Sequence, residues 1–220
     1  MEHFGVKLIK RKYSFKLKRE EFALISTKPS LPMFDYLVKK DAYTDKTGTR
    51  YRKEWCEEYR KLCLQNFDLN MKYFSLLDRE EFNNTIYEFL KKHNGFCKIS
   101  NLFDYNKVSG YYLMILDEYK QVYIGKAANI KRRIQQHWSS SKPFDRTLFP
   151  MYESTTSCFS IDFFRALDTT RIYVWKKSLS DGVEKKLIED FPKIYVTNRI
   201  GGGISNGIEA LSTIHKRIFQ

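Results

Sequence analysis

The chain has no apolar run approaching the roughly 20 residues needed to span a bilayer, and its N-terminus lacks the apolar core of a signal peptide. Both absences argue against a membrane protein. We therefore expect a cytoplasmic protein without a membrane partner. Its 220 residues are enough to bury a hydrophobic core and allow one domain or two small ones.

Cysteine is scarce, and the four residues of this type, Cys56, Cys63, Cys97 and Cys158, form no CxxC pair. No histidine is clustered with them at the separations typical of zinc ligands. The spacing argues against a zinc site. We expect reduced and mostly buried thiols.

Acidic residues are too few to balance the basic ones, and the formal net charge is +13. The excess is spread along the chain, with +6 over residues 1–105 (21 basic, 15 acidic) and +7 over residues 106–220 (18 basic, 11 acidic). Contacts from Lys and Arg to phosphates dominate affinity for nucleic acid, so the charge indicates a polyanionic partner such as DNA. Ordinary solubilising charge is the alternative explanation.

Residues 1–105 are expected to form a mainly helical N-terminal region. Residues 1–20 alternate basic and apolar side chains, which is typical of an edge strand or a pair of short strands. Residues 51–67 carry apolar side chains at helical spacing. A second helix is expected to begin after Asp78, an N-cap residue followed by a glutamate three positions later, and to end at Gly95. No motif is recognised here, and substrate recognition or regulation is our hypothesis for this region.

Two short β-rich runs, residues 111–116 and 121–124, flank four polar residues and predict a β-hairpin. If the loop has an even number of residues, Leu116 faces Gln121 and Met114 faces Tyr123. Tyr112 then faces Gly125.

In that register Tyr112 and Tyr123 lie on one sheet face as diagonal neighbours, because side chains alternate with a period of two. An odd loop would separate them. Gly125 opposite Tyr112 is expected to leave open space over the phenol, through which a substrate enters.

A helix is expected after Gly125, with Asn129 as its N-cap and Ile130 and Ile134 as its apolar stripe. Arg133 and His137 are also four residues apart and project side by side from this helix. Two cations beside two phenols suit an anionic substrate.

Residues 170–175 (TRIYVW) predict a strand that completes the sheet with the hairpin. Residues 142–164, between the helix and this strand, are interpreted as an inserted helix-loop segment near the site. Gly201 to Gly203 predict a turn. Residues 208–219 predict a last, capping helix.

Asp181 is expected to cap a helix over residues 182–191 that Pro192 ends. Glu184 falls on its apolar side, where an unpaired carboxylate would be costly, so it needs a partner. The two alternatives are a salt bridge to Arg133 and a divalent metal ion.

Several of these residues occur in an order that resembles the motif of the GIY-YIG nucleases. They are Gly110-Tyr111-Tyr112, Tyr123-Ile124-Gly125, Arg133 and His137. Tyr111 stands where that family has isoleucine, at a position expected to face away from the site. The family motif continues with a glutamate at the start of a later helix and an asparagine beyond it, and Glu184 and Asn198 stand where these are needed. The resemblance covers roughly residues 108–203.

The resemblance implies an α+β fold, in which a small antiparallel sheet of about three strands is flanked by helices over residues 106–220. It implies a DNA endonuclease that hydrolyses phosphodiester bonds. A single Mg²⁺ or Mn²⁺ would be bound by Glu184, water and the scissile phosphate, and Tyr112 would be the general base. Arg133 would stabilise the pentavalent phosphate, Tyr123 and His137 would position water or phosphate, and Asn198 would orient the site.

Substrate contacts are assigned to Gly125, Lys126 and Arg132. A free phenol has a pKa near 10, so Tyr112 needs a neighbouring cation to act as a base, and Lys126 is our candidate. Two other functions remain open. One is a nucleic-acid-binding module that kept the fold and lost catalysis, and the other is a protein-interaction domain with an incidental basic surface.

Overall fold

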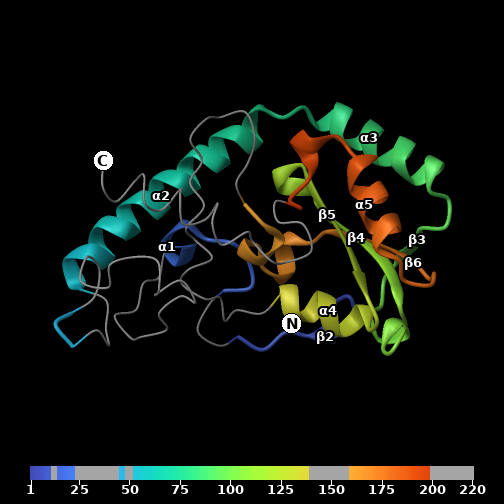
Figure 1. The fold of residues 1–220 in the computed structure, drawn as a ribbon, viewed down its shortest axis with the longest axis horizontal. Helices are drawn as coiled ribbons and strands as arrows, with labels where there is room; N and C mark the ends of the chain where they lie inside the picture. The colour runs from blue at the N-terminus through green and yellow to red at the C-terminus, as the bar shows by residue number, and fades with distance from the viewer. Residues whose placement is uncertain (11–13, 23–44, 48–51, 139–158, 199–220) are drawn as a thin grey trace.

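The computed structural model describes residues 1–10, 14–22, 45–47, 52–138 and 159–198 (Figure 1). The turn predicted at residues 201–203 and the helix predicted at 208–219 lie outside these residues. So does the part of the predicted insertion that precedes residue 159.

A four-stranded antiparallel sheet forms the centre of the fold, in the order β3-β6-β4-β5 (Figure 1). The strands are β3 (Cys97–Ile99), β4 (Gly110–Leu116), β5 (Gln121–Ala127) and β6 (Arg171–Trp175). The α+β class is therefore confirmed, and the sheet has one strand more than the three expected. The additional strand, β3, precedes the boundary expected near residue 105, so the sheet includes a strand from the N-terminal region.

The register of the hairpin between β4 and β5 is the predicted one. Leu116 pairs with Gln121, Met114 with Tyr123, and Tyr112 with Gly125. The loop has four residues, in which a 3-10 turn at Asp117–Tyr119 leads to Lys120 in the left-handed conformation (φ 49°). This even count places Tyr112 and Tyr123 on one face of the sheet.

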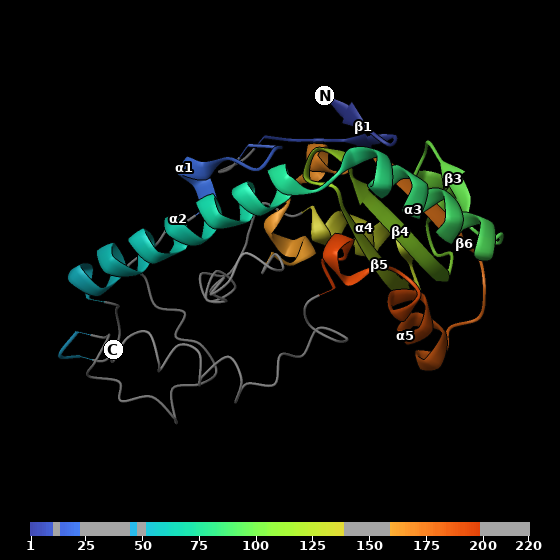
Figure 2. The same cartoon turned by 90° about the horizontal axis from the view of Figure 1, so that it is seen from above.

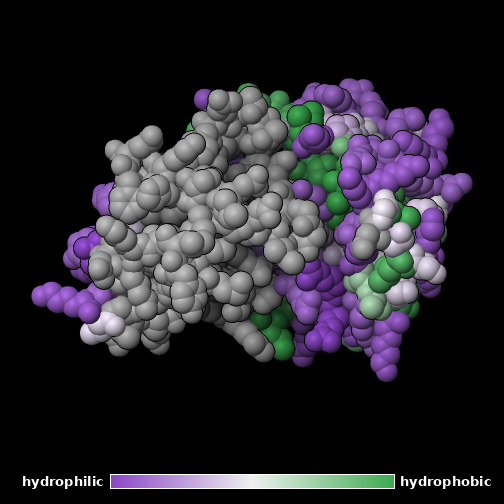
Figure 3. All heavy atoms as spheres, viewed as in Figure 1, coloured by the Kyte–Doolittle hydropathy of each residue, from purple (hydrophilic) through white to green (hydrophobic). Residues whose placement is uncertain are grey.

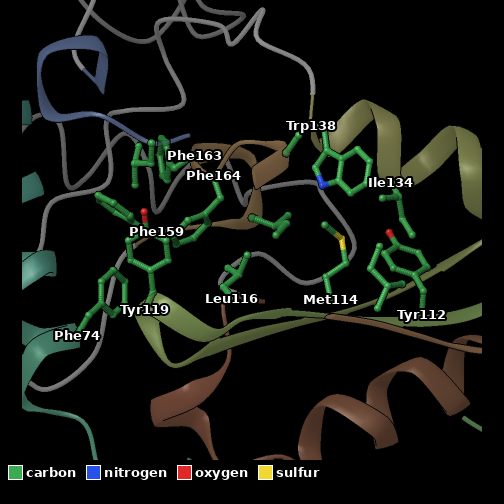
Figure 4. Close-up of a cluster of buried hydrophobic side chains, with 14 of the residues drawn as sticks. Phe74, Tyr112, Met114, Leu116, Tyr119, Ile134, Trp138, Phe159, Phe163 and Phe164 are labelled. Atoms are coloured by element: carbon green, nitrogen blue, oxygen red, sulfur yellow. The ribbon is translucent and has the colours of Figure 1, made fainter. Parts of the chain in front are cut away.

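Each face of the sheet packs against its own helices (Figure 2). Helix α4 (Ile130–His137) lies on the face of Tyr112 and Met114, where Ile130 and Ile134 are buried. Figure 4 shows Tyr112 at one end of this aromatic-rich cluster, beside Ile134. Helices α3 (Arg79–Lys92) and α5 (Asp181–Glu189) cover the face of Tyr111. Tyr111 thus faces away from Tyr112, as predicted.

The N-terminal region begins with a two-stranded hairpin of β1 (Glu2–His3) and β2 (Val6–Lys7) and continues with α1 (Arg19–Phe22) and α2 (Lys53–Leu76). The helix predicted over residues 51–67 therefore extends to Leu76. Its extra turns also contribute to the core, because Tyr73 and Phe74 are buried. The Phe74 ring lies 5.6 Å from that of Tyr119. No helix among the described residues is long and apolar enough to cross a membrane.

Two of the three predicted helix caps are confirmed. The Asp78 carboxylate accepts a hydrogen bond from the Glu81 N–H (2.7 Å), and Asn129 Oδ1 accepts one from the Arg132 N–H (3.0 Å). The third is wrong by one residue, because Ser180 is the N-cap of α5 and Asp181 is its first residue. The Tyr111 hydroxyl accepts a hydrogen bond from the Ser180 N–H (2.7 Å), which fixes where the helix begins.

Short 3-10 helices connect these elements, at Phe103–Tyr105, Ile161–Phe163, Ala166–Asp168 and Lys193–Tyr195. The thiols of Cys56 and Cys63 are buried, and that of Cys97 is exposed. Cys158 lies outside the described residues.

Candidate active site

Two tyrosines on neighbouring strands form the centre of the site. The rings of Tyr112 and Tyr123 lie 6.0 Å apart and are inclined by 45°. Tyr112 is fully buried, whereas Tyr123 remains partly exposed. The site therefore has an inner phenol and an outer one.

Helix α4 brings Arg133 and His137 onto these phenols from one side, as their four-residue spacing predicts. The Arg133 guanidinium lies close enough to both phenols that its charge lowers the pKa of Tyr112 and of Tyr123. His137 Nε2 lies 2.9 Å from Tyr112 Oη, and its ring meets that of Tyr123 edge-on at 4.9 Å. His137 is buried, while Arg133 reaches the surface. Four of the predicted residues thus form one connected cluster.

Burial raises the pKa of Tyr112 well above its ordinary value, and the proximity of Tyr123 raises it further. The Arg133 cation acts in the opposite direction but does not overcome burial. The pKa of Tyr123 is also raised, by burial in the first place and by Glu184 in addition. Both phenols therefore hold their protons at neutral pH.

The expectation of open space between Gly125 and the Tyr112 phenol is wrong. A Cβ built on Gly125 would lie 2.5 Å from Tyr112 Oη and 2.9 Å from Tyr123 Cε1. The absent side chain therefore makes room for the phenol itself. The sequence revealed that a side chain was missing but not which group occupies its place.

Lys126 and Glu184 form an ion pair, with Lys126 Nζ 3.3 Å from Glu184 Oε2. This pairing differs from the predicted alternative, a salt bridge from Glu184 to Arg133. Side chains alternate along β5, so Lys126 points to the face opposite Tyr112, toward α5. The cation that lowers the pKa of Tyr112 is therefore Arg133 and not Lys126. Glu184 retains 19% side-chain exposure and lies close enough to Tyr123 to influence its pKa.

Asn198 supports the edge strand β5 from outside the sheet. Its Oδ1 accepts a hydrogen bond from the Ile124 N–H (3.0 Å), and its Nδ2 donates to the Ile124 carbonyl (2.6 Å). Ile124 lies between Tyr123 and Gly125, so Asn198 fixes the backbone of the outer tyrosine.

Arg132 is exposed on α4.

Asp162, which the motif did not include, also belongs to the cluster. Its Oδ1 lies 3.2 Å from His137 Nδ1. It comes from a 3-10 helix 25 residues beyond His137 in the chain, and nothing in its local sequence (SIDFF) indicates contact with that histidine. Only the folded chain brings the two together.

A metal ion would find no complete set of protein ligands at this site. Among the described residues there is no group of three His, Cys, Asp or Glu side chains that could hold an ion. Mg²⁺ is often bound by one or two carboxylates, several waters and a substrate phosphate. The partly exposed carboxylate of Glu184, close enough to influence the pKa of Tyr123, fits that second arrangement.

No family model, curated protein or solved structure gives a significant match to this chain. The resemblance to GIY-YIG nucleases therefore rests on the residues and their spacing alone.

Proposed function

We propose that the protein is a metal-dependent endonuclease that hydrolyses phosphodiester bonds in DNA. The main support is the hairpin register, which places Tyr112 and Tyr123 on one sheet face where the charge of Arg133 acts on both. A guanidinium close to two phenols suits the extra negative charge that phosphorus acquires when water attacks it.

The charge of the chain supports DNA as the substrate. The net charge of +13 is shared by both halves of the sequence, and over the described residues the face in Figure 3 is mostly hydrophilic. Arg132 and Arg133 are both exposed on α4, where they can meet the phosphate backbone.

Tyr112 is the proposed general base, and its raised pKa sets a condition on that role. A free phenolate would be costly to form in this buried position. Tyr112 therefore takes a proton from water as it passes its own proton to His137 Nε2, 2.9 Å away. The water enters beside Tyr123 and Arg133, which both reach the surface.

Glu184 is the residue that would hold a Mg²⁺ or Mn²⁺ ion together with waters and the scissile phosphate. When bound, the metal supplies positive charge to the phosphoryl and leaving oxygens. The ion pair with Lys126 engages Glu184 Oε2, and Lys126 also brings a cation to the same edge of the sheet. Asn198 keeps Tyr123 and Gly125 in place by fixing the backbone between them.

One observation favours the alternative, a nucleic-acid-binding module without catalysis. Tyr112 has no exposed surface, so catalysis requires a small opening of the cluster to admit water.

A cleavage assay separates the two functions. We expect purified protein to cut duplex, single-stranded or branched DNA in the presence of Mg²⁺ and to stop in EDTA. Salt-sensitive DNA binding without cleavage under every metal condition would support the binding module instead.

A further inference from the structure

The imidazole of His137 lies between two oxygen atoms from different parts of the chain. Its Nε2 faces Tyr112 Oη at 2.9 Å, and its Nδ1 faces Asp162 Oδ1 at 3.2 Å. Asp162 is held in place because its neighbours Ile161 and Phe163 are both buried in the cluster under α4.

The positions of the hydrogen atoms between Tyr112, His137 and Asp162 follow from the chemistry of the carboxylate. A carboxylate only accepts, so His137 Nδ1 carries a proton toward Asp162. A neutral imidazole protonated at Nδ1 has an acceptor at Nε2, and the Tyr112 hydroxyl donates to it. Both hydrogen bonds then run in one direction, from Tyr112 through His137 to Asp162.

We propose that Asp162 is a positioning residue that keeps His137 protonated at Nδ1, so that Nε2 is available to receive the proton of Tyr112. This inference rests on the proposed function for its role in cleavage. The Tyr112 O–H bond breaks as the His137 Nε2–H bond forms, and a proton from the attacking water replaces the one lost by Tyr112. Asp162 then faces an imidazolium, whose charge it stabilises until the extra proton returns to solvent.

The tautomer of His137 tests this directly and needs no cleavage. Long-range ¹H–¹⁵N spectra distinguish protonation at Nδ1 from protonation at Nε2, and His137→Gln identifies the signals among the four histidines. We expect the Nδ1–H form in the native protein. In Asp162→Asn, an amide that can donate to Nδ1 should shift the ring toward Nε2–H. An unchanged Nδ1–H form in that variant would overturn the proposal.

Cleavage supplies the second measurement. Asp162→Asn should lower the single-turnover rate by at least roughly 10- to 100-fold, the range seen when a group that orients a metal-bound histidine is lost. Asp162→Glu should restore part of the rate, and Asp104→Asn, at an exposed carboxylate, should change neither rate nor spectrum. A switched tautomer with an unchanged rate would refute the role in catalysis. A native protein that cleaves no DNA but shows the expected tautomers would refute the nuclease and not the orientation.

Discussion

Tyr112 and Gly125 lie directly opposite each other in β4 and β5, and the phenol of one occupies the space where the other would carry a Cβ. The inner tyrosine of the candidate site is therefore positioned by a missing side chain as well as by Arg133 and His137.

Gly125→Ala should destabilise the protein, because the new Cβ would lie 2.5 Å from Tyr112 Oη and the buried ring has little room to shift. We expect a loss of about 1–3 kcal/mol in the free energy of unfolding, measured with urea, and weaker cleavage as Tyr112 moves from His137. Gly182→Ala is the matched control. Apart from its chain neighbours and the backbone of its own helix, nothing lies within 4 Å of a Cβ built there, so the stability of this variant should stay the same or rise. Equal stability of the two variants would contradict the packing described here.

Tyr112→Phe removes the proposed general base and keeps the ring. The cleavage rate should fall by about 10²–10⁴-fold, the usual contribution of general acid–base catalysis. Tyr111→Phe is a control from the adjacent position on the other face, where the hydroxyl binds Ser180. It should cost about 1 kcal/mol of stability and leave cleavage intact. A similar loss of rate in both variants would mean that Tyr112 acts through the fold.

Arg133→Ala should lower the cleavage rate by about 10²–10³-fold, since it removes the cation beside Tyr112 and Tyr123. It should also raise the pKa of both tyrosines, because the Arg133 cation lowers each of them. Arg132→Ala, on the same helix, should weaken DNA binding and reduce its salt dependence without such a loss of rate. Binding isotherms over a range of salt concentrations and single-turnover assays distinguish these effects.

Glu184→Ala should abolish metal-dependent cleavage in a protein that remains folded, because Glu184 is the proposed metal ligand and is partly exposed. Glu189→Ala is the control from the same helix, where the carboxylate makes an exposed ion pair with Lys185. It should be fully active. Full cleavage by a folded Glu184→Ala protein would remove the basis of the mechanism.

Acidification should weaken the attachment of the N-terminal hairpin through His3. Its Nε2 lies 2.8 Å from the Thr169 carbonyl oxygen, and burial lowers its pKa below the ordinary value of 6.5. The unfolded chain therefore binds this proton at a higher pH than the folded chain, and stability should decline as the pH falls through 6.5. His3→Phe keeps a ring beside Phe4 and Trp138 and should show a smaller decline in urea unfolding between pH 7.5 and pH 5.5, roughly one unit either side of that pKa. Identical slopes would exclude His3 as the titrating group.

The hairpin and its helix were predictable because each depends on local rules. Counting residues across the loop fixed which side chains face each other, and Asn129 followed by two isoleucines four residues apart defined the start and buried side of α4. Arg133 and His137 then followed from helical spacing alone.

Contacts between distant segments could not be predicted in the same way. Strand β3 has only three residues, two of them exposed, so its sequence gives no alternating signal, and its pairing depends on β6 more than 70 residues later. Asp162 meets His137 only through the packing of the segment that carries it. Lys126 follows the second motif triplet directly, which suggests that it lowers the pKa of Tyr112. Strand alternation instead directs its side chain to the other face of the sheet, where it pairs with Glu184.

The position of β6 between β3 and β4 also constrains the order of assembly. During synthesis β4 and β5 can pair as soon as the hairpin has left the ribosome, since they are adjacent in sequence. Strand β3 is made earlier but finds its partner only when residues 171–175 emerge. The chain therefore carries an unpaired strand through much of its translation, and a ribosome stalled before residue 171 would hold a polypeptide in which neither β3 nor the inner edge of β4 is covered by β6.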